Sequence, residues 1–328
     1  MTVAILHDQV PEGAPPDAAD ALVQARAVRS ALTRLGWSSV TLAATLDLDH
    51  LRRELTRLQP AFAFNLVESL EGHGRLIHVV PYLLEALGIP YTGASAEAVF
   101  LTSNKLLGKR LLRAAGIATP DWVELDTTSA NTPPPVGAAY IVKSVWEHAS
   151  IGLDQEAVVT VRSRREIRRA IQRRRSQLGG DAFAEAYIHG REFNLSLLAG
   201  REGPEVLPPA EMRFAGRGPG EPLVVDYQEK WGEPDPHRYT YRAFRFPRRE
   251  ASLLEQLRQV ALQCWACFGL RGYARVDFRV DAEGKPWVLE INTNPCLAPD
   301  AGFAAAVARA GLAMTQALER IVADGLGA

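Results

Sequence analysis

Two stretches near the end of the chain carry side chains whose types and spacing suit a divalent metal ion. Arg275 and Asp277 alternate with apolar residues in the first stretch, and Glu290 and Asn292 do so in the second. This period of two predicts two strands, and the Asp-Ala-Glu-Gly turn at 281–284 makes them antiparallel neighbours. The oxygens of Asp277, Glu290 and Asn292 then share one face, and Mg²⁺ prefers oxygen ligands. A solvated hairpin held by an Arg–Asp pair is the alternative interpretation.

The segment that follows the second strand favours a functional site. It reads Asn-Thr-Asn-Pro-Cys over 292–296, which is a polar turn locked by proline directly after an apolar strand. Loops of this kind often carry binding residues, because a rigid scaffold positions them.

The elements that must position these residues form a first segment at 1–101. Strands are expected at 2–6, 39–43 and 61–66, and helices at 17–35, 51–58 and 79–87. Strands and helices in alternation predict a parallel sheet with helices on its faces.

Two further segments are expected at 102–188 and 189–328. The first contains a helix at 105–115, an exposed Pro-rich connection at 132–135, an arginine-rich helix at 163–177, and strands at 122–125, 140–143, 157–161 and 182–186. The second contains a helix at 251–268, one long helix at 302–322, and strands at 193–198, 273–280 and 287–291. Both patterns predict α+β structure.

The overall composition excludes several classes of protein. The 328 residues are 47% hydrophobic and 23% charged, and 37 basic residues balance 38 acidic ones, so nothing global indicates binding to nucleic acid or a membrane. Three cysteines are too few for a disulfide scaffold, and the first residues lack the features of a secretory signal. We therefore expect a cytoplasmic protein.

The strand pair and its loop resemble the D-alanine–D-alanine ligase family of the ATP-grasp superfamily. The corresponding family pattern is Arg-x-Asp followed by Glu-x-Asn-Thr-x-Pro. The similarity runs almost continuously from Phe64 to Leu297. It implies a Rossmann-like N-terminal sheet, followed by a two-lobed α+β ATP-grasp domain that binds ATP and Mg²⁺, with two metal ions expected and Mn²⁺ as an alternative.

The resemblance also implies residues that bind the nucleotide. Lysines at 105, 143 and 230 correspond to family lysines that meet phosphate, and residues 147–152 stand where the family has its Gly-Ser-Ser loop. In that loop His148 replaces a glycine. The remaining nucleotide residues implied in this way, together with the loop residues, are Glu147, Ser150, Glu185, Tyr187, Ile188 and Glu192. The resemblance places residues 183–188 and Glu192 at the adenosine end, where Glu185 and Glu192 would be the carboxylates that hold adenine and ribose.

For catalysis, the resemblance implies Arg275, Lys230, Ser150 and the backbone N–H of Cys296. Cys296 replaces a family glycine, but a backbone donor does not depend on the side chain. Asn65 and Glu68 stand near the place of a substrate loop, and a substrate-binding role for Glu68 and a merely solvated one are equally supported. The family's first-substrate segment is absent from residues 7–13, so strict D-alanine specificity is not expected.

The implied function is ATP-dependent ligation of an amino-acid carboxylate to an amine through an acyl phosphate. The partners are then small amino-acid or peptide substrates, with no nucleic acid and no membrane, and a homodimer is conceivable. The first alternative is an ATP-binding protein of the same fold with altered catalysis. The second is an RNA-associated protein that uses the eight arginines within 162–175, although the apolar stripe of that segment favours a solvated helix.

Cys264 and Cys267 have redox spacing but are interpreted as two small core residues.

Overall fold

A parallel three-stranded sheet forms the N-terminal part of the computed structural model, which describes residues 2–125, 137–148, 150–218 and 220–327. Its strand order is β2-β1-β3, with β1 at Thr2–Asp8, β2 at Ser38–Ala44 and β3 at Phe62–Asn65. Alternate residues of β1 face opposite sides. Val3 and Ile5 pack in a core with α1 (Pro16–Arg34), and Ala4 and Leu6 pack with α2 (Leu48–Leu58) and α3 (Val79–Ala86).

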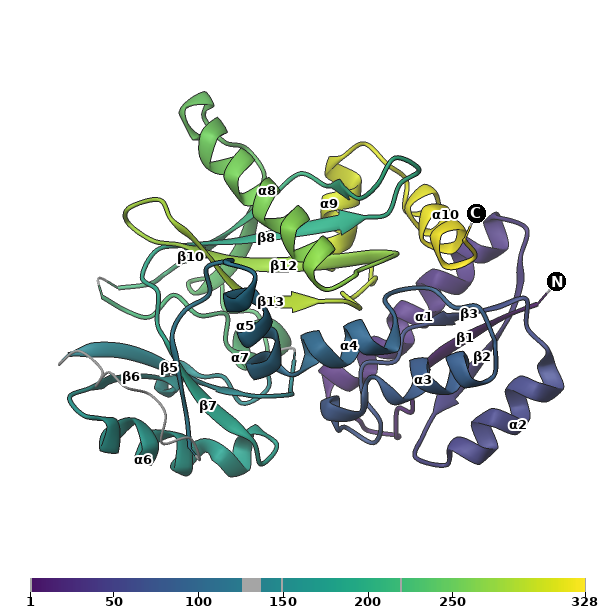
Figure 1. The fold of residues 1–328 in the computed structure, drawn as a ribbon, viewed down its shortest axis with the longest axis horizontal. Coiled ribbons are helices and arrows are strands. Elements are labelled where there is room, and N and C mark those ends of the chain that lie inside the picture. Colours follow the sequence, from purple (N-terminus) through teal and green to yellow (C-terminus); the bar gives the residue numbers. More distant parts are fainter. Residues whose placement is uncertain (1, 126–136, 149, 219, 328) are drawn as a thin grey trace.

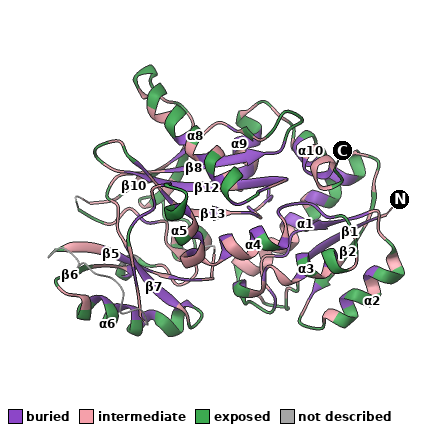
Figure 2. Cartoon of the chain, in the orientation of Figure 1, coloured by how far each residue is buried: buried purple, intermediate pink, exposed green. Residues whose placement is uncertain are grey.

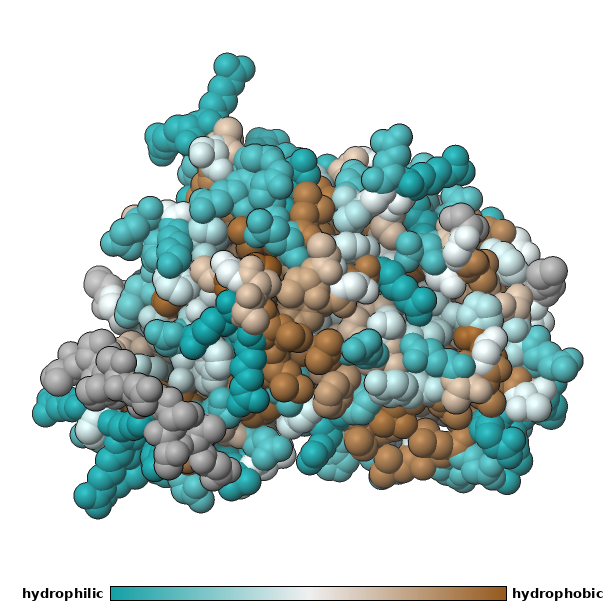
Figure 3. All heavy atoms as spheres, viewed as in Figure 1, coloured by the Kyte–Doolittle hydropathy of each residue, from teal (hydrophilic) through white to brown (hydrophobic). Residues whose placement is uncertain are grey.

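A four-stranded antiparallel sheet lies at the opposite end of the molecule (Figure 1). Its order is β4-β7-β5-β6, with β4 at Trp122–Glu124, β5 at Ala138–Ser144, β6 at Val158–Val161 and β7 at Ala182–Ala186. The arginine-rich helix α6 (Arg164–Arg174) packs Ile167 and Ile171 onto this sheet, and a 3-10 turn at Arg175–Leu178 follows it. The rest of α6 is hydrophilic surface (Figure 3).

The third sheet has six strands and lies between the other two. The path is β11-β10-β8-β12-β13, and β9 pairs with β8. The strands are β8 at Arg191–Leu198, β9 at Glu205–Val206, β10 at Ala210–Ala215, β11 at Tyr239–Ala243, β12 at Tyr273–Val280 and β13 at Pro286–Asn292.

Helices connect this sheet to its neighbours. One face packs against α8 (Ala251–Cys267), α4 (Ala96–Ser103) and α5 (Lys105–Ala114). Near its other end, α9 (Gly302–Arg309) and α10 (Met314–Gly325) share a core with α1 of the parallel sheet. Figure 2 shows the resulting buried band through the sheets, with exposed outer helix faces. The remaining short helices are α7 (Tyr227–Trp231) and 3-10 turns at Gly74–Leu76, Gln155–Ala157 and Arg248–Glu250.

The predicted fold class is confirmed, with differences in some elements. The single helix expected at 302–322 is two helices, because the chain turns at 310–313, where Gly311 has a φ of +77°. Helices α4 and α7 and strands β9, β10 and β11 were not predicted. Cys264 is buried as expected, but Cys267 is exposed, so its prediction as a core residue is wrong. The Pro-rich connection at 132–135 lies outside the described residues.

The three predicted segments each contain one sheet, but their cores are not separate. Leu112 of α5 and Val99 of α4 pack in the core of the six-stranded sheet, although residues 112 and 99 belong to the other two predicted segments. We therefore keep the division at 1–101, 102–188 and 189–328 as a proposal. In the described part of the chain, no helix is long and apolar enough to cross a membrane.

Candidate active site

A cavity of about 510 Å³ is lined by residues from all three sheets. Asp8 ends β1 of the parallel sheet, Lys143 belongs to β5 of the four-stranded sheet, and Asp277 belongs to β12 of the six-stranded sheet. The cavity therefore exists only when the three sheets are packed together.

The predicted strand pair forms one wall of this cavity. Strands β12 and β13 are antiparallel neighbours, with Arg275 opposite Asn292 and Asp277 opposite Glu290. The register shifts after Asp277, which indicates a β-bulge at this position. All four side chains line the cavity, as the alternation of the sequence predicted.

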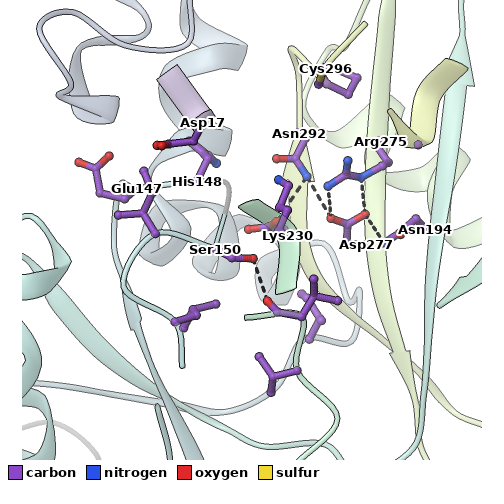
Figure 4. Close-up of a pocket in the computed structure, with 18 of the residues that line it drawn as sticks. Asp17, Glu147, His148, Ser150, Asn194, Lys230, Arg275, Asp277, Asn292 and Cys296 are labelled. Carbon is purple, nitrogen blue, oxygen red and sulfur yellow. Dashed lines mark hydrogen bonds and ion pairs between the residues drawn. The ribbon is translucent and has the colours of Figure 1, made fainter. Parts of the chain in front are cut away.

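Asp277 is the centre of the hydrogen bonds in this wall (Figure 4). Arg275 donates to its two carboxylate oxygens from Nε and Nη2, each at 2.7 Å. Asn194 of β8 donates to it at 2.8 Å, and the amide nitrogen of Asn292 donates at 3.1 Å. The side-chain oxygen of Asn292 takes no part in these bonds. Asn194 was not identified from the sequence, although it faces Asp277 in the register of β8 and β12.

Lysines bring positive charge next to these carboxylates. Lys105 lies 4.0 Å from Glu290 and donates a 2.7 Å hydrogen bond to the backbone oxygen of Glu147. Burial opposes ionisation of Glu290, but Lys105 and Lys143 outweigh it and hold the pKa of this carboxyl at about 2. Glu290 is therefore a carboxylate at any physiological pH.

Glu185 lies between two lysines. Its carboxylate contacts Lys143 at 2.7 Å and Lys109 at 2.6 Å, and both Glu185 and Lys109 are almost completely buried. Burial opposes the ionisation of Glu185, but Lys109 and Lys143 lower the pKa of its carboxyl overall. Lys109 was missed because, on an isolated helix, it is indistinguishable from a solvated lysine.

The residues expected at the adenosine end also line the cavity. They include Tyr187, Ile188 and Glu192. Glu192 forms an ion pair with Arg279 at 3.0 Å, and the Tyr187 hydroxyl oxygen accepts a hydrogen bond from the backbone N–H of Leu223 at 2.7 Å. This end of the cavity combines aliphatic and aromatic surface with a fixed carboxylate.

The glycine-rich polar segment 217–231, whose composition is typical of a closing loop, is called the covering segment below. Its residues Val224, Val225, Glu229, Lys230 and Trp231 line the cavity. Arg217 and Glu229 form an ion pair of 2.6 Å within this segment, and Ser150 donates to the backbone oxygen of Val225 at 2.9 Å. Lys230 lines the cavity as an exposed residue, and desolvation of its amine together with the charge of Arg275 lowers the pKa of that amine.

Helix α1 contributes a polar surface that the sequence did not reveal. Asp17, Asp20 and Gln24 all line the cavity. Gln24 donates to Glu68 at 3.0 Å and to Asp20 at 3.3 Å, and the Cys296 thiol donates to Asp20 at 3.0 Å. Spacings of three and four residues place the three α1 side chains on one helix face, which is the signal that could have found them.

Glu68 and Asn65 differ in their surroundings. Glu68 lines the cavity, and burial raises the pKa of its carboxyl to about 7. Asn65 is not among the lining residues. Its side-chain oxygen accepts the backbone N–H of Val67 at 3.3 Å, so it stabilises the turn after β3. The sequence could not distinguish these orientations, because Asn65 ends β3 and Glu68 follows only three residues later.

The fold identifies the class of protein. The structure of D-alanine–D-alanine ligase from Bacillus anthracis superimposes with a TM-score of 0.76 at 23% identity, covering 100% of this chain and 98% of that one. The same ligase complexed with ATP superimposes with a TM-score of 0.73 at 21% identity. The chain therefore has the fold of this class of ligase.

The sequence identifies the family. Residues 111–323 match the family model described as D-ala D-ala ligase C-terminus. A D-alanine–D-alanine ligase from a Synechococcus strain is 32% identical over 79% of this chain and 74% of its own length. One from Pseudomonas entomophila is 32% identical over 92% and 86%. The chain belongs to the D-alanine–D-alanine ligase family of the ATP-grasp superfamily. It is a ligase that joins a carboxylate to an amine with cleavage of ATP to ADP and phosphate, and nothing in these similarities favours an ATP-binding protein with altered catalysis.

Proposed function

We propose that the cavity is the site where the chain activates an amino-acid carboxylate with ATP and joins it to an amine. The observation that carries the proposal is that Asp277, Glu290 and Asn292 line one cavity beside Arg275. Lysines 105, 143 and 230 line the same cavity. A triphosphate and a divalent metal require this combination of positive charges and oxygen ligands.

Asp277, Glu290 and Asn292 are the residues that would hold the metal. The donor set fits, because both carboxylates face the cavity and the Asn292 oxygen is free of the bonds that its amide nitrogen makes. We propose two Mg²⁺ ions, with Mn²⁺ as a substitute, since such hard ions favour oxygen ligands and share phosphate oxygens. Bound metal would neutralise phosphate charge.

Lys105 and Lys143 would contact the phosphates, and Tyr187, Ile188 and Glu192 would hold the adenosine. The contacts of Glu185 do not favour a role in holding adenine, because both of its carboxylate oxygens already bind lysines. We propose that Glu185 positions Lys143. Glu147 would act through its backbone oxygen, which holds Lys105.

In the reaction, a carboxylate oxygen of the first substrate attacks the terminal phosphorus of ATP, and ADP leaves. The amine of the second substrate then attacks the acyl carbon, loses a proton, and displaces inorganic phosphate. Arg275, Lys230 and the backbone N–H of Cys296 would stabilise the oxyanion of this second step, and Ser150 would hold the covering segment closed through Val225. Each preorganised donor of this kind contributes roughly 3 kcal/mol to the transition state.

The substrates that we propose are two amino acids, or an amino acid and a short peptide. The relatives are named for D-alanine, but the family's first-substrate segment is absent from residues 7–13 and Cys296 replaces a family glycine. The acidic residues Asp17, Asp20 and Glu68 would bind the ammonium group of a substrate. A homodimer and a cytoplasmic location remain predictions from the sequence.

Phosphate release from ATP tests the proposal. Release should require both an amino acid and an amine acceptor, and pairwise screening with mass spectrometry of the product would identify the pair. Glu290→Gln should reduce turnover at least 100-fold, since roughly 3 kcal/mol of electrostatic stabilisation is lost. Glu283→Gln, an exposed substitution in the same hairpin, serves as the matched control. Full activity of a folded Glu290→Gln protein would contradict the metal assignment.

A further inference from the structure

His148 is a half-buried side chain at the cavity to which the mechanism above gives no role. Its side chain lines the cavity, and both ring nitrogens are buried without a hydrogen-bond partner among the described residues. Buried polar atoms in proteins are nearly always paired, so two unpaired nitrogens on one ring indicate that a bound molecule supplies the partner.

The chain around His148 is held in place from several sides. The Ser144 hydroxyl oxygen accepts the backbone N–H groups of Trp146 and Glu147, at 3.2 and 3.0 Å. Lys105 holds the backbone oxygen of Glu147, and the backbone oxygen of His148 itself accepts the N–H of Ile151 at 3.1 Å. These hydrogen bonds fix the backbone on both sides of His148, and the fixed backbone directs the ring to the cavity.

The surroundings of the ring define which ligand atoms it would meet. Lys105, Glu290, Arg275 and Lys230 all lie close enough to act on its charge. In the view of Figure 4 the ring lies between Glu147 and Lys230. Burial, and then the charge of Lys105, lower the pKa of His148 to about 3, so the ring is neutral and carries one N–H donor. Of these residues, Lys105 and Lys230 are lysines that the family resemblance places at the phosphates.

We propose that the His148 imidazole donates a hydrogen bond to the terminal phosphate of bound ATP. It thereby takes over part of the role that small residues and backbone amides play in the phosphate loop of the family pattern. This inference rests on the proposed nucleotide site and adds a specific contact to it. The contact distinguishes ATP from ADP, because ADP lacks the phosphate that the ring would meet.

Calorimetric binding of ATP and of ADP, each with Mg²⁺, tests the contact without turnover. In His148→Gly the Kd for ATP should rise about tenfold or more, the expected loss for a hydrogen bond to a charged group, and the Kd for ADP should change less than twofold. His148→Asn keeps a side-chain N–H donor and should recover part of the ATP affinity. His50→Gln, an exposed substitution on α2, should change neither constant.

Each outcome decides the question. Unchanged ATP affinity in His148→Gly, or an equal loss for ATP and ADP, would overturn the contact, the second because the loss would then reflect a general disturbance of the loop. If the unaltered protein bound neither nucleotide, the proposed nucleotide site itself would be wrong. Unaltered ADP binding in the variant also shows that its site is folded.

Discussion

Four carboxylates of the N-terminal segment 1–101 line the cavity without an ion pair to a basic side chain in the described part of the chain. Asp8, Asp17, Asp20 and Glu68 line it, and in the described ranges none of them forms an ion pair. Neutral donors hold them instead, such as Gln24 for Glu68 and the Ser69 hydroxyl for Asp8. Burying a carboxylate without a cation costs free energy, which appears as the raised pKa of Glu68. Local stability is thus lowered at residues that remain available for a substrate.

The pH dependence of stability should report Glu68. The pKa of its carboxyl is about 7 in the folded protein against 4.5 for a freely solvated glutamate, so the folded state binds the proton more tightly. Stability is therefore lost as the pH rises from about 4.5 to about 7. Glu68→Gln removes this loss, and its free energy of unfolding relative to the unaltered protein should rise by roughly 1 to 3 kcal/mol between these pH values.

Urea unfolding at about pH 4.5 and about pH 8 measures this difference. Glu283→Gln, in an exposed turn, should show no such rise and is the control. A flat or falling difference for Glu68→Gln would mean that the carboxyl titrates normally in the folded protein.

Among the elements, the junction between β7 and β8 depends on one glycine. Gly190 has a φ of +147°, and a Cβ atom there would overlap the backbone oxygen of Val280 at the end of β12. Only glycine permits this close approach, which aligns Arg191 with Val280 in the register of β8 and β12. The same register places Asn194 beside Asp277, so the geometry of the site depends on this approach.

Gly190→Ala should therefore destabilise the protein by about 3 kcal/mol or more. Gly203 is the matched control, because its φ is +114° but a Cβ atom there would meet nothing within 4 Å. Gly203→Ala should cost only the backbone strain, about 1 kcal/mol. Denaturant unfolding measures both, and equal losses would show that the contact with Val280 relaxes without cost.

At the scale of the whole molecule, the covering segment is fastened to the N-terminal helix. The Tyr227 hydroxyl of α7 donates a 2.6 Å hydrogen bond to Asp17 of α1, which is 210 residues away in the chain. This bond joins α7, which carries Lys230, to α1, which carries Asp20. It is also exposed enough to break without unfolding either element.

Tyr227→Phe should release the covering segment while leaving the fold intact. We expect trypsin to cleave after Lys230 several-fold faster, and KM for the substrates to rise, with Tm changed by no more than a few degrees. Tyr239→Phe on the exposed strand β11 is the control and should change neither quantity. An unchanged cleavage rate in Tyr227→Phe would show that the ion pair of Arg217 with Glu229 holds the segment by itself.

The sequence by itself determined the strand pair of the site and most of the elements around it. Arg275 and Asp277 share a face because side chains alternate along any strand, and the turn at 281–284 sets the pairing with Glu290. These are local properties that need no knowledge of the remaining chain. Helices α1 and α6 are also predictable from local sequence, because their apolar residues recur at helical spacing.

Only the tertiary structure decided which polar residues meet across the cavity. Cys296 and Asp20 form a hydrogen bond although they are 276 residues apart, and Gln24 of α1 donates to Glu68. Lys109 and Lys143 lie in different elements and both contact Glu185. Such contacts depend on how the three sheets pack, and the packing follows from the sum of many apolar contacts in shared cores. The type of a polar residue gives no information on how these apolar contacts bring the three sheets together. For this reason Asn65 turned away from the cavity, whereas Asp17, Asp20 and His148 turned out to line it.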